Sequence, residues 1–488
     1  MNIFISGIGG AGLGPLAEIA LDAGYQVFGS DLSHSLQTNE LETRGVQIFY
    51  SQNAENLAKI HQKNPIDWLI QTSALPPDAP ELAFAKTHGI KTSKRDEFLA
   101  NFIQQKNLKL IAVAGTHGKT TTTAMLVWLF RELKIPVSYS VGATLPFAKT
   151  GHFDSNSRYF IYEADEYDRN FLAFYPQISL IPSLDYDHSD IYKTRADYQN
   201  AFSEFISQSQ KVLLWRQNFD DLYNYSDDNF GNNSRKVLAD FREKTRSSSS
   251  DFFRGSAKNF REKFTILDEK TSRNLINLAG EKSRQNATLA LNLMREIRPK
   301  LTRENHNLTE EFDEKLIAKI LSEFPGTSRR FEKLTISNCH PELVSGSGEI
   351  FTDYAHHPAE IAATVEKARE IAKKSGANVV AIFEPHQNLR QTEIVREGGY
   401  GASFAGVSRI FWLPTYLVRG DLAPNAATVL TPENLIKTLD ETSRNVAEPA
   451  EMNDELFAKI QQSLARGDLV LLMGAGTVDA WIREKIAE

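Results

Sequence analysis

The stretch LIAVAGTHGKTTTT, residues 110–123, decides the fold of this chain. A short apolar run predicts a buried strand, two glycines predict a tight loop, and residues 121–133 predict a helix. Strand, glycine loop and helix in that order are typical of a phosphate-binding loop in an α/β domain. The usual loop has one more glycine where this chain has Val113, so this loop is a shortened version of the pattern.

The side chains of this loop fit a nucleoside triphosphate and a metal ion. Small residues let successive backbone N–H groups converge on phosphate oxygens, a lysine reaches the outer phosphates, and a hydroxyl can hold Mg²⁺. The following helix directs the positive end of its dipole at the same place. A Gly-Lys-Thr turn also occurs by chance, but the flanking strand and helix favour a site for ATP and Mg²⁺. The residues in these roles are Gly115, Gly118, Lys119, Thr120 and, at the start of the helix, Thr121.

A second glycine-rich turn, GIGGAGLG, occupies residues 7–14. It follows an apolar strand at 3–5 and precedes a helical pattern and a strand at 26–28, which ends in Gly29-Ser30-Asp31. This order is that of a βαβ unit that binds a nucleotide, with the acid near the ribose hydroxyls. Close packing of a helix on a strand also produces such turns. With two loops in one chain, one could hold ATP and the other the diphosphate of a nucleotide-linked substrate.

The rest of the chain repeats the alternation of strands and helices, which predicts an α/β protein. A chain of 488 residues is too long for one hydrophobic core. We expect a Rossmann-like domain at 1–105, a central phosphate-loop domain at 106–322 and a C-terminal domain at 323–488. Further strands are expected at 66–72, 160–163, 178–183, 331–336, 349–353, 379–383, 410–413 and 469–473, and a further helix at 286–297.

Two segments are predicted to be surface insertions. Residues 243–258 are polar and serine-rich, which is typical of a loop outside the core. Residues 339–348, CHPELVSGSG, lie between two expected strands, and their Pro, Gly and Ser content predicts a hairpin tip. Cys339 would then be exposed and have no chemical role.

Composition excludes several classes of function. The net charge of -7 gives no excess of Lys and Arg that would collect phosphates of a nucleic acid or a membrane surface. One cysteine among 488 residues allows no internal disulfide. The start MNIFISGIGG lacks the pattern of a secretion signal, and no apolar run approaches the length of a membrane span. We therefore expect a cytoplasmic protein.

Acidic motifs follow two of the expected strands, EADEYD at 163–168 and DYDH at 185–188. Because ligands of α/β sheets bind at the carboxyl ends of strands, we expect both motifs near the phosphate loop. Mg²⁺ takes carboxylate oxygen and keeps several waters, so Glu163 is the expected ligand. Strand alternation predicts that Glu163 and Asp165 face one side. The alternatives are a solvated acidic turn and, for His188, a hydrogen-bonded core histidine.

Two further motifs carry titratable groups after strands, DYAHHPAE at 353–360 and FEPHQNLR at 383–390. Pro358 could begin a helix at the end of the first motif. Histidines and an arginine at strand ends suit recognition of carboxylates or phosphates, because arginine offers a planar pair of donors. The pair Arg329-Arg330 could do the same, or form a solvated edge.

These parts favour phosphoryl transfer. No Gly-x-Ser-x-Gly elbow occurs, and the one cysteine lies in a predicted hairpin tip, so covalent catalysis has no good candidate. ATP, Mg²⁺ and a second anionic nucleotide site remain, and positioning and charge neutralisation provide most of the acceleration in phosphoryl transfer. The acceptor could be water, in an NTPase, or a substrate group, in a kinase or an ATP-driven ligase.

The sequence resembles the Mur ligase family across nearly its whole length. The family implies three domains: a Rossmann-like module for a UDP-sugar, a phosphate-loop ATPase, and a Rossmann-like module for an amino acid. Two departures stand out, Gln285 where the family usually has His, and Pro182-Ser183 where it usually has Thr-Asn. The matching stretches are GIGGAGLGPLAEIA, GSD, VAGTHGKTTTT, EADEYD, DYDHSDIY, QNATLAL, PGTSRRFE, DYAHHPAEI, FEPHQNLR and MGAGTVD.

The resemblance implies a role for individual residues. The UDP-sugar would contact Gly9, Gly10, Ala11, Gly12, Ser30, Asp31, Ser73 and His117. ATP would contact Gly115, Thr116, Gly118, Lys119, Thr120, Thr121, Asn286, Arg330 and Asp353, with Asn286 at the adenine. The metal would be held by Thr120, Glu163 and His188, and the amino acid by His357, His386 and Arg390. Four residues are expected to take part in the chemical steps: Lys119, His117, Glu163 and His188.

The reaction that the resemblance implies joins L-alanine to the carboxylate of UDP-N-acetylmuramate, with ATP, in peptidoglycan precursor synthesis. The carboxylate attacks the γ-phosphate to give an acyl phosphate and ADP, and the amine then displaces phosphate. His117 would help to stabilise the charge of the tetrahedral intermediate that forms when the amine attacks. One alternative is a ligase for a recycled tripeptide, against which His386 counts, since that enzyme has Arg there. The other is a non-catalytic nucleotide sensor. The sequence leaves monomer and homodimer open.

Overall fold

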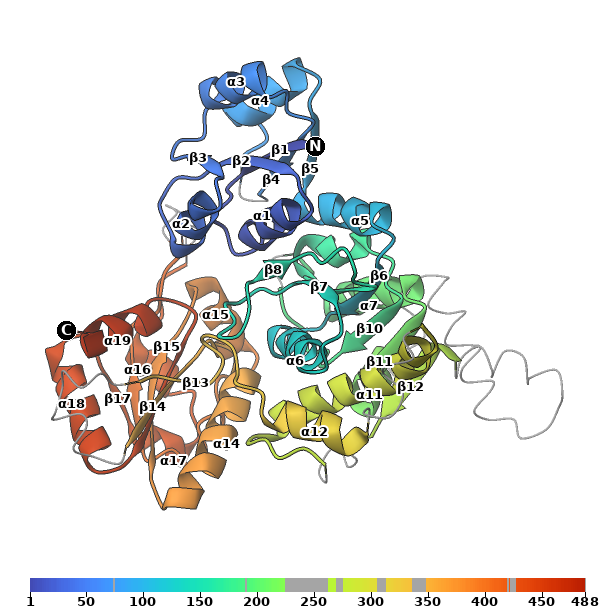
Figure 1. Ribbon diagram of the computed structural model, residues 1–488. Coiled ribbons are helices and arrows are strands. Elements are labelled where there is room, and N and C mark those ends of the chain that lie inside the picture. Colours follow the sequence, from blue (N-terminus) through green and yellow to red (C-terminus); the bar gives the residue numbers. More distant parts are fainter. Residues whose placement is uncertain are drawn as a thin grey trace. The chain divides into compact units, whose positions relative to one another are not determined.

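The computed structural model describes residues 1–72, 75–188, 191–223, 262–268, 275–304, 313–335, 348–418, 421 and 427–487. These residues form an α/β structure, the class that the sequence predicts, and contain three sheets (Figure 1). The two predicted insertions, at 243–258 and at 339–348 with Cys339, lie outside the described residues, apart from Gly348. Within the described part, none of the helices is long and apolar enough to cross a membrane.

The first sheet has five parallel strands in the order β3-β2-β1-β4-β5. One face packs on α3 and α4, and the other packs on α1 and α5, which Figure 1 shows as blue helices on both sides of the strands. This doubly wound order puts the first glycine loop between β1 and α1. The strands are β1 (Asn2–Ser6), β2 (Gln26–Ser30), β3 (Gln47–Phe49), β4 (Trp68–Gln71) and β5 (Lys91–Lys94); the helices are α1 (Leu13–Asp22), α2 (Leu36–Thr43), α3 (Ala54–Lys63), α4 (Pro80–Thr87) and α5 (Arg95–Gln105).

The second sheet has seven strands in the order β12-β11-β10-β6-β9-β7-β8 and is parallel except at β8. Its central strand β6 is fully apolar beyond Lys109 and carries the phosphate loop. The strands are β6 (Lys109–Val113), β7 (Val137–Ser140), β8 (Gly151–His152), β9 (Tyr159–Glu163), β10 (Ile178–Ile181), β11 (Lys211–Trp215) and β12 (Phe264–Leu267). The helices are α6 (Lys119–Glu132), the 3-10 helix η1 (Tyr167–Ala173), α7 (Arg195–Gln208), α8 (Arg216–Tyr223), α11 (Glu281–Glu304) and α12 (Glu314–Ser322).

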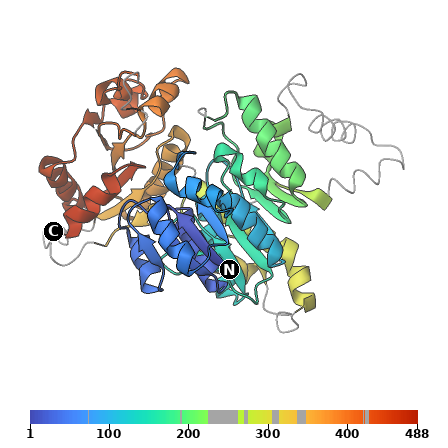
Figure 2. The ribbon, with the colours of Figure 1, turned by 90° about the horizontal axis from the view of Figure 1, so that it is seen from above.

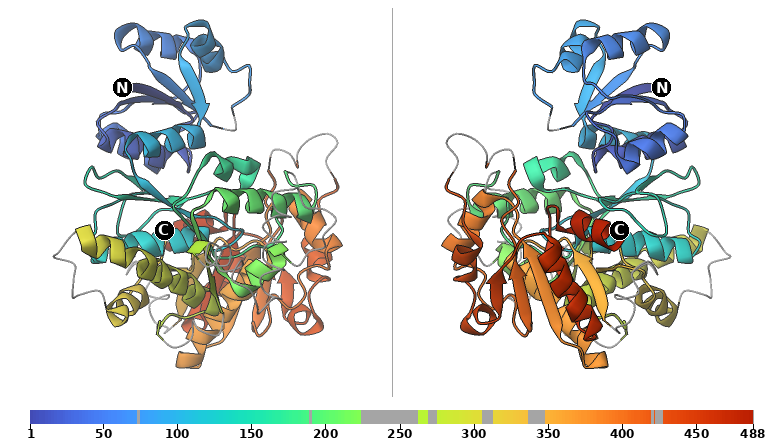
Figure 3. Two further views of the ribbon diagram at one scale, coloured as in Figure 1. Left: turned by 90° about the vertical axis from the view of Figure 1, so that its right-hand side faces the viewer. Right: turned by 90° about the vertical axis from the view of Figure 1, so that its left-hand side faces the viewer.

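The third sheet has six strands in the order β13-β14-β18-β15-β16-β17, parallel except at β13. Helix α14 packs on one face and α18 and α19 on the other, and Figure 3 shows these strands side by side between helices. The strands are β13 (Glu332–Lys333), β14 (Glu349–Asp353), β15 (Val379–Glu384), β16 (Arg409–Trp412), β17 (Ala447–Pro449) and β18 (Leu469–Gly474). The helices are α14 (Pro358–Ser375), α15 (Asn388–Arg396), α16 (Pro432–Ile436), α17 (Glu441–Arg444), α18 (Asp454–Ala465) and α19 (Val478–Ala487).

The chain packs into two compact units. The first comprises Met1–Ile276 and Gln285–Phe324, and the second comprises Asn277–Arg284 and Pro325–Glu488. In the first unit, side chains of the first sheet, of α5 and of the second sheet share one apolar core. Figure 2 views the ribbon from above and shows strands of each sheet lying among helices. The predicted limits of the three domains at 105 and 322 stay predictions.

Two local expectations are wrong. Helix α6 begins at Lys119 and not at Thr121, because Gly118 adopts a left-handed conformation with φ 83° and turns the chain directly into the helix. The alternation that would place Glu163 and Asp165 on one side does not occur, because β9 ends at Glu163 and the chain then enters η1.

Candidate active site

The phosphate loop is a tight connection between β6 and α6. Gly115 has φ 147°, and a Cβ atom there would lie 2.6 Å from the carbonyl oxygen of Ser183. Gly118 has φ 83°, and a Cβ atom there would lie 2.9 Å from Oδ1 of Asn286. Both positions therefore require glycine. The contact with Gly118 also places the amide of Asn286, the predicted adenine ligand, directly against the loop.

Lys119 folds back over the loop. Its Nζ donates hydrogen bonds to the carbonyl oxygens of Gly115 (2.6 Å) and Thr116 (3.3 Å) and to Oε1 of Glu166 (2.8 Å). An ammonium group has three protons to donate, so these three acceptors satisfy it. The loop thus holds its lysine at the carboxyl end of the sheet, where phosphate oxygens would compete with these partners.

Glu166 is the buried counter-ion of this site. Its side chain is 0% exposed, and its Oε1 lies 2.8 Å from Lys119 Nζ and 3.4 Å from Nε2 of His188. Burial alone would raise the pKa of Glu166, but the charges and hydrogen bonds of Lys119 and His188 together outweigh burial and lower it. Conversely, burial would lower the pKa of His188, and the carboxylates of Glu166 and Asp187 outweigh burial and raise it. A buried carboxylate between a lysine and a histidine is therefore the electrostatic centre of the site.

Glu163 fixes the hydroxyl of the loop. Thr120 Oγ1 donates to Glu163 Oε1 at 2.6 Å, and the backbone N–H of Gly142 donates to Glu163 Oε2 at 2.8 Å. A hydroxyl and a carboxylate at this distance are hard oxygen donors of the kind that Mg²⁺ takes, together with phosphate and water. Among the described residues, no cluster of three His, Cys, Asp or Glu side chains could hold a metal. The residues present fit a metal shared with a phosphate, not an all-protein cage.

His188, the third predicted metal ligand, lies beside Glu166 and not beside Glu163 in the contacts that the structure shows. Its Nε2 approaches Glu166 and, at 4.0 Å, Asp187. His188 also has φ 58°, a conformation uncommon for a residue with a Cβ atom. The structure thus brings His188 to Lys119 and Glu166 and brings Glu163 to Thr120.

His117 and Thr116 are braced by the segment after β10. The backbone N–H of His117 donates to Ser183 Oγ at 2.7 Å, and Ser183 Oγ donates back to the carbonyl oxygen of His117 at 3.1 Å. Thr116 Oγ1 donates to the carbonyl oxygen of Asp185 at 2.5 Å. His117 Nε2 lies 3.7 Å from Asp185 Oδ2. Ser183 thus holds the backbone of the loop although the family usually has Asn at this position.

The first glycine loop closes on its own acid. The backbone N–H of Gly9 donates to Asp31 Oδ2 at 2.7 Å, and that of Leu32 donates to Asp31 Oδ1 at 2.7 Å. The carboxylate predicted to reach a ribose therefore also shapes the loop. Gly10 and Ala11 complete the turn, Ser30 is buried at the end of β2, and Ser73 lies outside the described residues. A Cβ atom on Gly12 would lie 2.2 Å from Arg95 Nη1, so this glycine makes room for an arginine.

Two of the residues predicted to bind the amino acid, His386 and Arg390, lie around His356 in the second unit. Arg390 Nη1 lies 2.6 Å from Nε2 of His356, and the ring of His386 lies 5.9 Å from the ring of His356. Burial and the charge of Arg390 lower the pKa of His386, which is therefore neutral near pH 7. His357 caps α14, where its Nδ1 accepts from the N–H of Ala359 at 3.4 Å. An arginine beside two imidazoles suits a carboxylate.

The paired arginines divide their tasks. Arg329 Nη2 donates to the carbonyl oxygen of Gly474 at 3.1 Å, and its Nε lies 3.6 Å from Asp479 Oδ2. Both guanidinium groups also lie over the ring of Tyr354, that of Arg329 at 4.8 Å and that of Arg330 at 4.9 Å. Asp353 accepts hydrogen bonds from the N–H groups of Phe331 and Ala355. Burial raises the pKa of Asp353, and the positive charge of Arg330 opposes this rise. Arg329 is thus a structural residue, and Arg330 with Asp353 remain the predicted ATP contacts of this unit.

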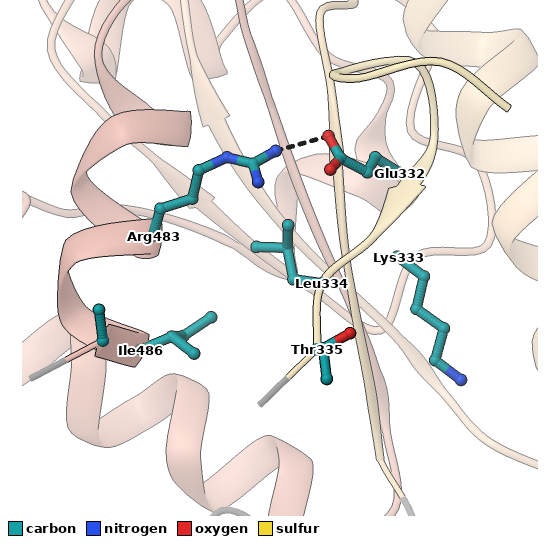
Figure 4. Close-up of a pocket in the computed structure, with 7 residues that line it drawn as sticks. Glu332, Lys333, Leu334, Thr335, Arg483 and Ile486 are labelled. Carbon is teal, nitrogen blue, oxygen red and sulfur yellow. Dashed lines mark hydrogen bonds and ion pairs between the residues drawn. The ribbon is translucent and has the colours of Figure 1, made fainter. Parts of the chain in front are cut away.

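A pocket on the second unit lies apart from these residues. It is formed by β13, the residues after it and α19, and Figure 4 shows Arg483 pointing across it to Glu332, with 2.5 Å between Arg483 Nη2 and Glu332 Oε2. Leu334 and Ile486 provide its apolar wall. None of the predicted site residues lines this pocket.

Some residues of the site had no role assigned from the sequence. The sequence indicates no role for Glu166 beyond its place in EADEYD, and no ligand or catalytic role for Arg95, His356 or Ser183. The only signal for Glu166 is its place three residues beyond a strand that ends near the loop. No local pattern marks Arg95, because apart from Asp96 its partners Asp165 and Gly12 are 70 and 83 residues away in the chain.

Comparisons with known proteins place these features in a family. Three family models match: "Mur ligase family, catalytic domain" at residues 2–107, "Mur ligase middle domain" at 113–294, and "Mur ligase, glutamate ligase domain" at 341–476. The chain is 31% identical over 481 residues to a UDP-N-acetylmuramate–L-alanine ligase of Renibacterium salmoninarum, covering 98% of this chain and 93% of that one. It is 29% identical over 487 residues to the ligase of that name from Clostridium acetobutylicum, covering 98% and 95%. The crystal structure of the UDP-N-acetylmuramate–alanine ligase of Thermotoga maritima is similar, with a TM-score of 0.70, 20% identity, and coverage of 100% and 98%.

Proposed function

We propose that this chain, which belongs to the Mur ligase family, joins L-alanine to the carboxylate of UDP-N-acetylmuramate with cleavage of ATP. The product would serve peptidoglycan precursor synthesis. The observation that carries the proposal is the pairing of the phosphate loop with two carboxylates. Lys119 pairs with Glu166 and Thr120 with Glu163, within a chain that matches L-alanine ligases from end to end.

In the proposed reaction, the loop first binds the phosphates of ATP. Backbone N–H groups at the start of α6 and the Lys119 ammonium face the phosphate oxygens, and the tight turns at Gly115 and Gly118 let the backbone approach them. Phosphate would take over part of the coordination that Glu166 now gives to Lys119. The lysine then neutralises the charge that develops on the transferred phosphoryl group.

The carboxylate of the sugar nucleotide would attack the γ-phosphorus, and the bond to the β,γ-bridging oxygen would break, giving an acyl phosphate and ADP. The amine of L-alanine would then attack the acyl carbon, and inorganic phosphate would leave. His117 lies at the mouth of the loop, and its position suits a hydrogen bond to the reacting carboxylate. Arg390 would hold the carboxylate of the amino acid.

A metal ion belongs to this proposal. Thr120 and Glu163 would hold Mg²⁺ together with phosphate oxygens, and His188 would assist through Glu166 or directly. When bound, Mg²⁺ polarises the phosphoryl group and neutralises its charge. We also propose a cytoplasmic location, which suits a chain with a single cysteine.

One assay tests the proposal. Phosphate release is measured with ATP, Mg²⁺ and UDP-N-acetylmuramate, with L-alanine, glycine, L-serine or the L-alanyl-γ-D-glutamyl-meso-diaminopimelate tripeptide added in turn. We expect turnover with L-alanine above all. Turnover only with the tripeptide would make the chain a ligase of recycled peptide, and no turnover with any acceptor would favour a nucleotide sensor.

A further inference from the structure

Arg95, at the start of α5, contacts the first glycine loop and the acidic segment that follows β9. Its Nη1 faces Gly12, so closely that a Cβ atom there would lie 2.2 Å away. Its Nη2 lies 3.8 Å from Oδ2 of Asp165, the residue next to Glu166. One guanidinium therefore joins the loop proposed for the sugar nucleotide to the segment that holds Lys119.

The guanidinium is fixed in place by a buried carboxylate. Arg95 Nε donates to Asp96 Oδ2 and Nη2 donates to Asp96 Oδ1, both at 3.1 Å. The hydroxyl of Tyr162 donates to Asp96 Oδ1. Asp96 and Tyr162 are 4% and 3% exposed, so this contact excludes water. Tyr162 precedes Glu163 in β9, so α5 is attached to the strand that carries the Thr120 partner.

A second cation holds the far side of the same segment. Lys94 Nζ donates to Asp168 Oδ2 at 2.7 Å. Asp168 and Arg169 have φ 52° and 57°, a conformation that costs free energy for residues with a Cβ atom. Two consecutive residues, Lys94 at the end of β5 and Arg95 at the start of α5, thus pair with Asp168 and Asp165, and the strained residues of η1 lie next to these contacts.

We propose that Arg95 is a positioning residue that sets the register of the two loops, so that the substrate carboxylate and the γ-phosphate of ATP meet in line. This inference rests on the proposed function. Arg95 acts through Asp96, Tyr162 and Asp165 on the strand end that carries Glu163 and on Glu166, and it does not touch the reacting atoms. A displacement of the reacting groups by about 1 Å can lower a rate about 100-fold. If the two loops shift relative to each other, we therefore expect turnover to fall more than substrate binding.

The test compares Arg95→Met with wild type by two measurements. Steady-state phosphate release gives kcat and KM, and calorimetric titration gives Kd for UDP-N-acetylmuramate and for a non-hydrolysable ATP analogue with Mg²⁺. We expect kcat to fall by about 10-fold to 100-fold, with both Kd values nearly unchanged. Arg95→Lys keeps the charge near Asp165 but not the paired bonds to Asp96, so we expect it to restore part of kcat.

Two further variants separate positioning from stability. Tyr162→Phe removes the hydroxyl that donates to Asp96 and leaves Arg95 intact. We therefore expect kcat to fall, but by less than in Arg95→Met. Arg44→Met is the matched control. The side chain of Arg44 is 26% exposed, close to the 24% of Arg95, and it also pairs with a carboxylate, Asp22, at 2.6 Å. Within the described part of the chain, Arg44 makes no ion pair with the segment after β9. We expect Arg44→Met to lower thermal stability and to keep kcat.

The outcomes are distinct. A normal kcat in Arg95→Met, or an equal loss of kcat in Arg44→Met, would overturn the positioning role and leave the proposed function standing. A large rise in Kd for UDP-N-acetylmuramate with normal kcat at saturation would overturn it too, since Arg95 would then be a ligand of the sugar nucleotide. A wild-type protein without turnover with any acceptor would overturn the proposed function, and this inference with it.

Discussion

Lys119 is the residue on which the proposed chemistry depends most directly. Three acceptors hold its ammonium group. Burial would lower the pKa of Lys119, but the charge and hydrogen bond of Glu166, with the charges of Asp165 and Glu163, together outweigh burial and raise it. The lysine therefore stays charged at the pH at which ATP would bind. The neighbouring His117 is oriented by Ser183 through the backbone, so its side chain position follows from the same loop.

Replacing Lys119 tests the assignment of the two nucleotide sites. We expect Lys119→Ala to reduce phosphate release by about 100-fold or more, because the charge on the phosphoryl group loses its counter-ion. Binding of UDP-N-acetylmuramate, measured by calorimetry, should persist. Loss of both would mean that the two loops were assigned wrongly. Since Glu166 loses a buried partner in this variant, Lys119→Ala with Glu166→Gln is the control for stability.

Replacing His117 tests its proposed contact with the reacting carboxylate. We expect His117→Ala to lower kcat by about 100-fold while Kd for the ATP analogue changes much less. The ratio of these effects is the measurement that decides. If Kd for the analogue rises as much as kcat falls, His117 serves the phosphates and not the carboxylate.

At the scale of elements, helix α1 determines how the first sheet meets the second. The carboxylate of Glu18 accepts from the N–H of Gly151 at 2.7 Å, and Asp22 Oδ2 lies 2.8 Å from Nδ1 of His152, so α1 is fastened to β8. Burial would raise the pKa of Asp22, but its bonds from His152, Phe153 and Arg44 outweigh burial and lower the pKa to about 2.

This shift predicts a pH-dependent stability. A folded pKa of about 2 against 3.8 means that Asp22 stabilises the fold above pH 4 and that this contribution is lost as the pH falls towards 2. We expect Asp22→Asn to lower the free energy of unfolding by about 2 kcal/mol at pH 7 and by clearly less at pH 3. Urea unfolding at both pH values measures the difference.

The matched control for Asp22 is Asp154→Asn. Asp154 accepts a local bond from the N–H of Asn156 and does not contact α1. We expect a small and similar effect of this variant at both pH values. A loss for Asp22→Asn that is the same at pH 7 and pH 3 would contradict the proposed ion pairing.

At the scale of the whole molecule, the proposed ligands are distributed between two compact units. The phosphate loop and the first glycine loop belong to the first unit, and His386 and Arg390 belong to the second. The amino-acid site is therefore built by a sheet that contributes neither glycine loop. Each unit has its own apolar core, so a change in one need not disturb the folding of the other.

This division predicts a selective variant. We expect Arg390→Met to raise KM for L-alanine at least about 10-fold, because the carboxylate loses a charged donor, and to leave binding of UDP-N-acetylmuramate unchanged. Arg396→Met, an exposed residue on the same helix α15, is the control and should behave as wild type. Weakened binding of the sugar nucleotide in Arg390→Met would contradict the division.

The sequence by itself determined the local features. Apolar runs, glycine spacing and the Lys-Thr pair were sufficient for β6, the phosphate loop and its helix, because backbone conformation there depends on residues within about ten positions. The placement of EADEYD and DYDH after strands predicted acids near the loop, and Glu163, Glu166 and His188 do lie there. The starting point of α6 was two residues wrong, since a left-handed glycine at 118 is visible only in the structure.

Only the tertiary structure decided which partner each of these side chains has. The sequence pattern places Glu163 and Glu166 at one strand end but cannot tell that Thr120 takes the first and Lys119 the second. It gives no sign that Arg95 rests on Gly12, 83 residues earlier. Such pairs depend on the crossing of strands and helices far apart in the chain, and burial then decides the strength of each charge contact. Local periodicity reports only on neighbours in the sequence, so it cannot predict which distant side chains come into contact.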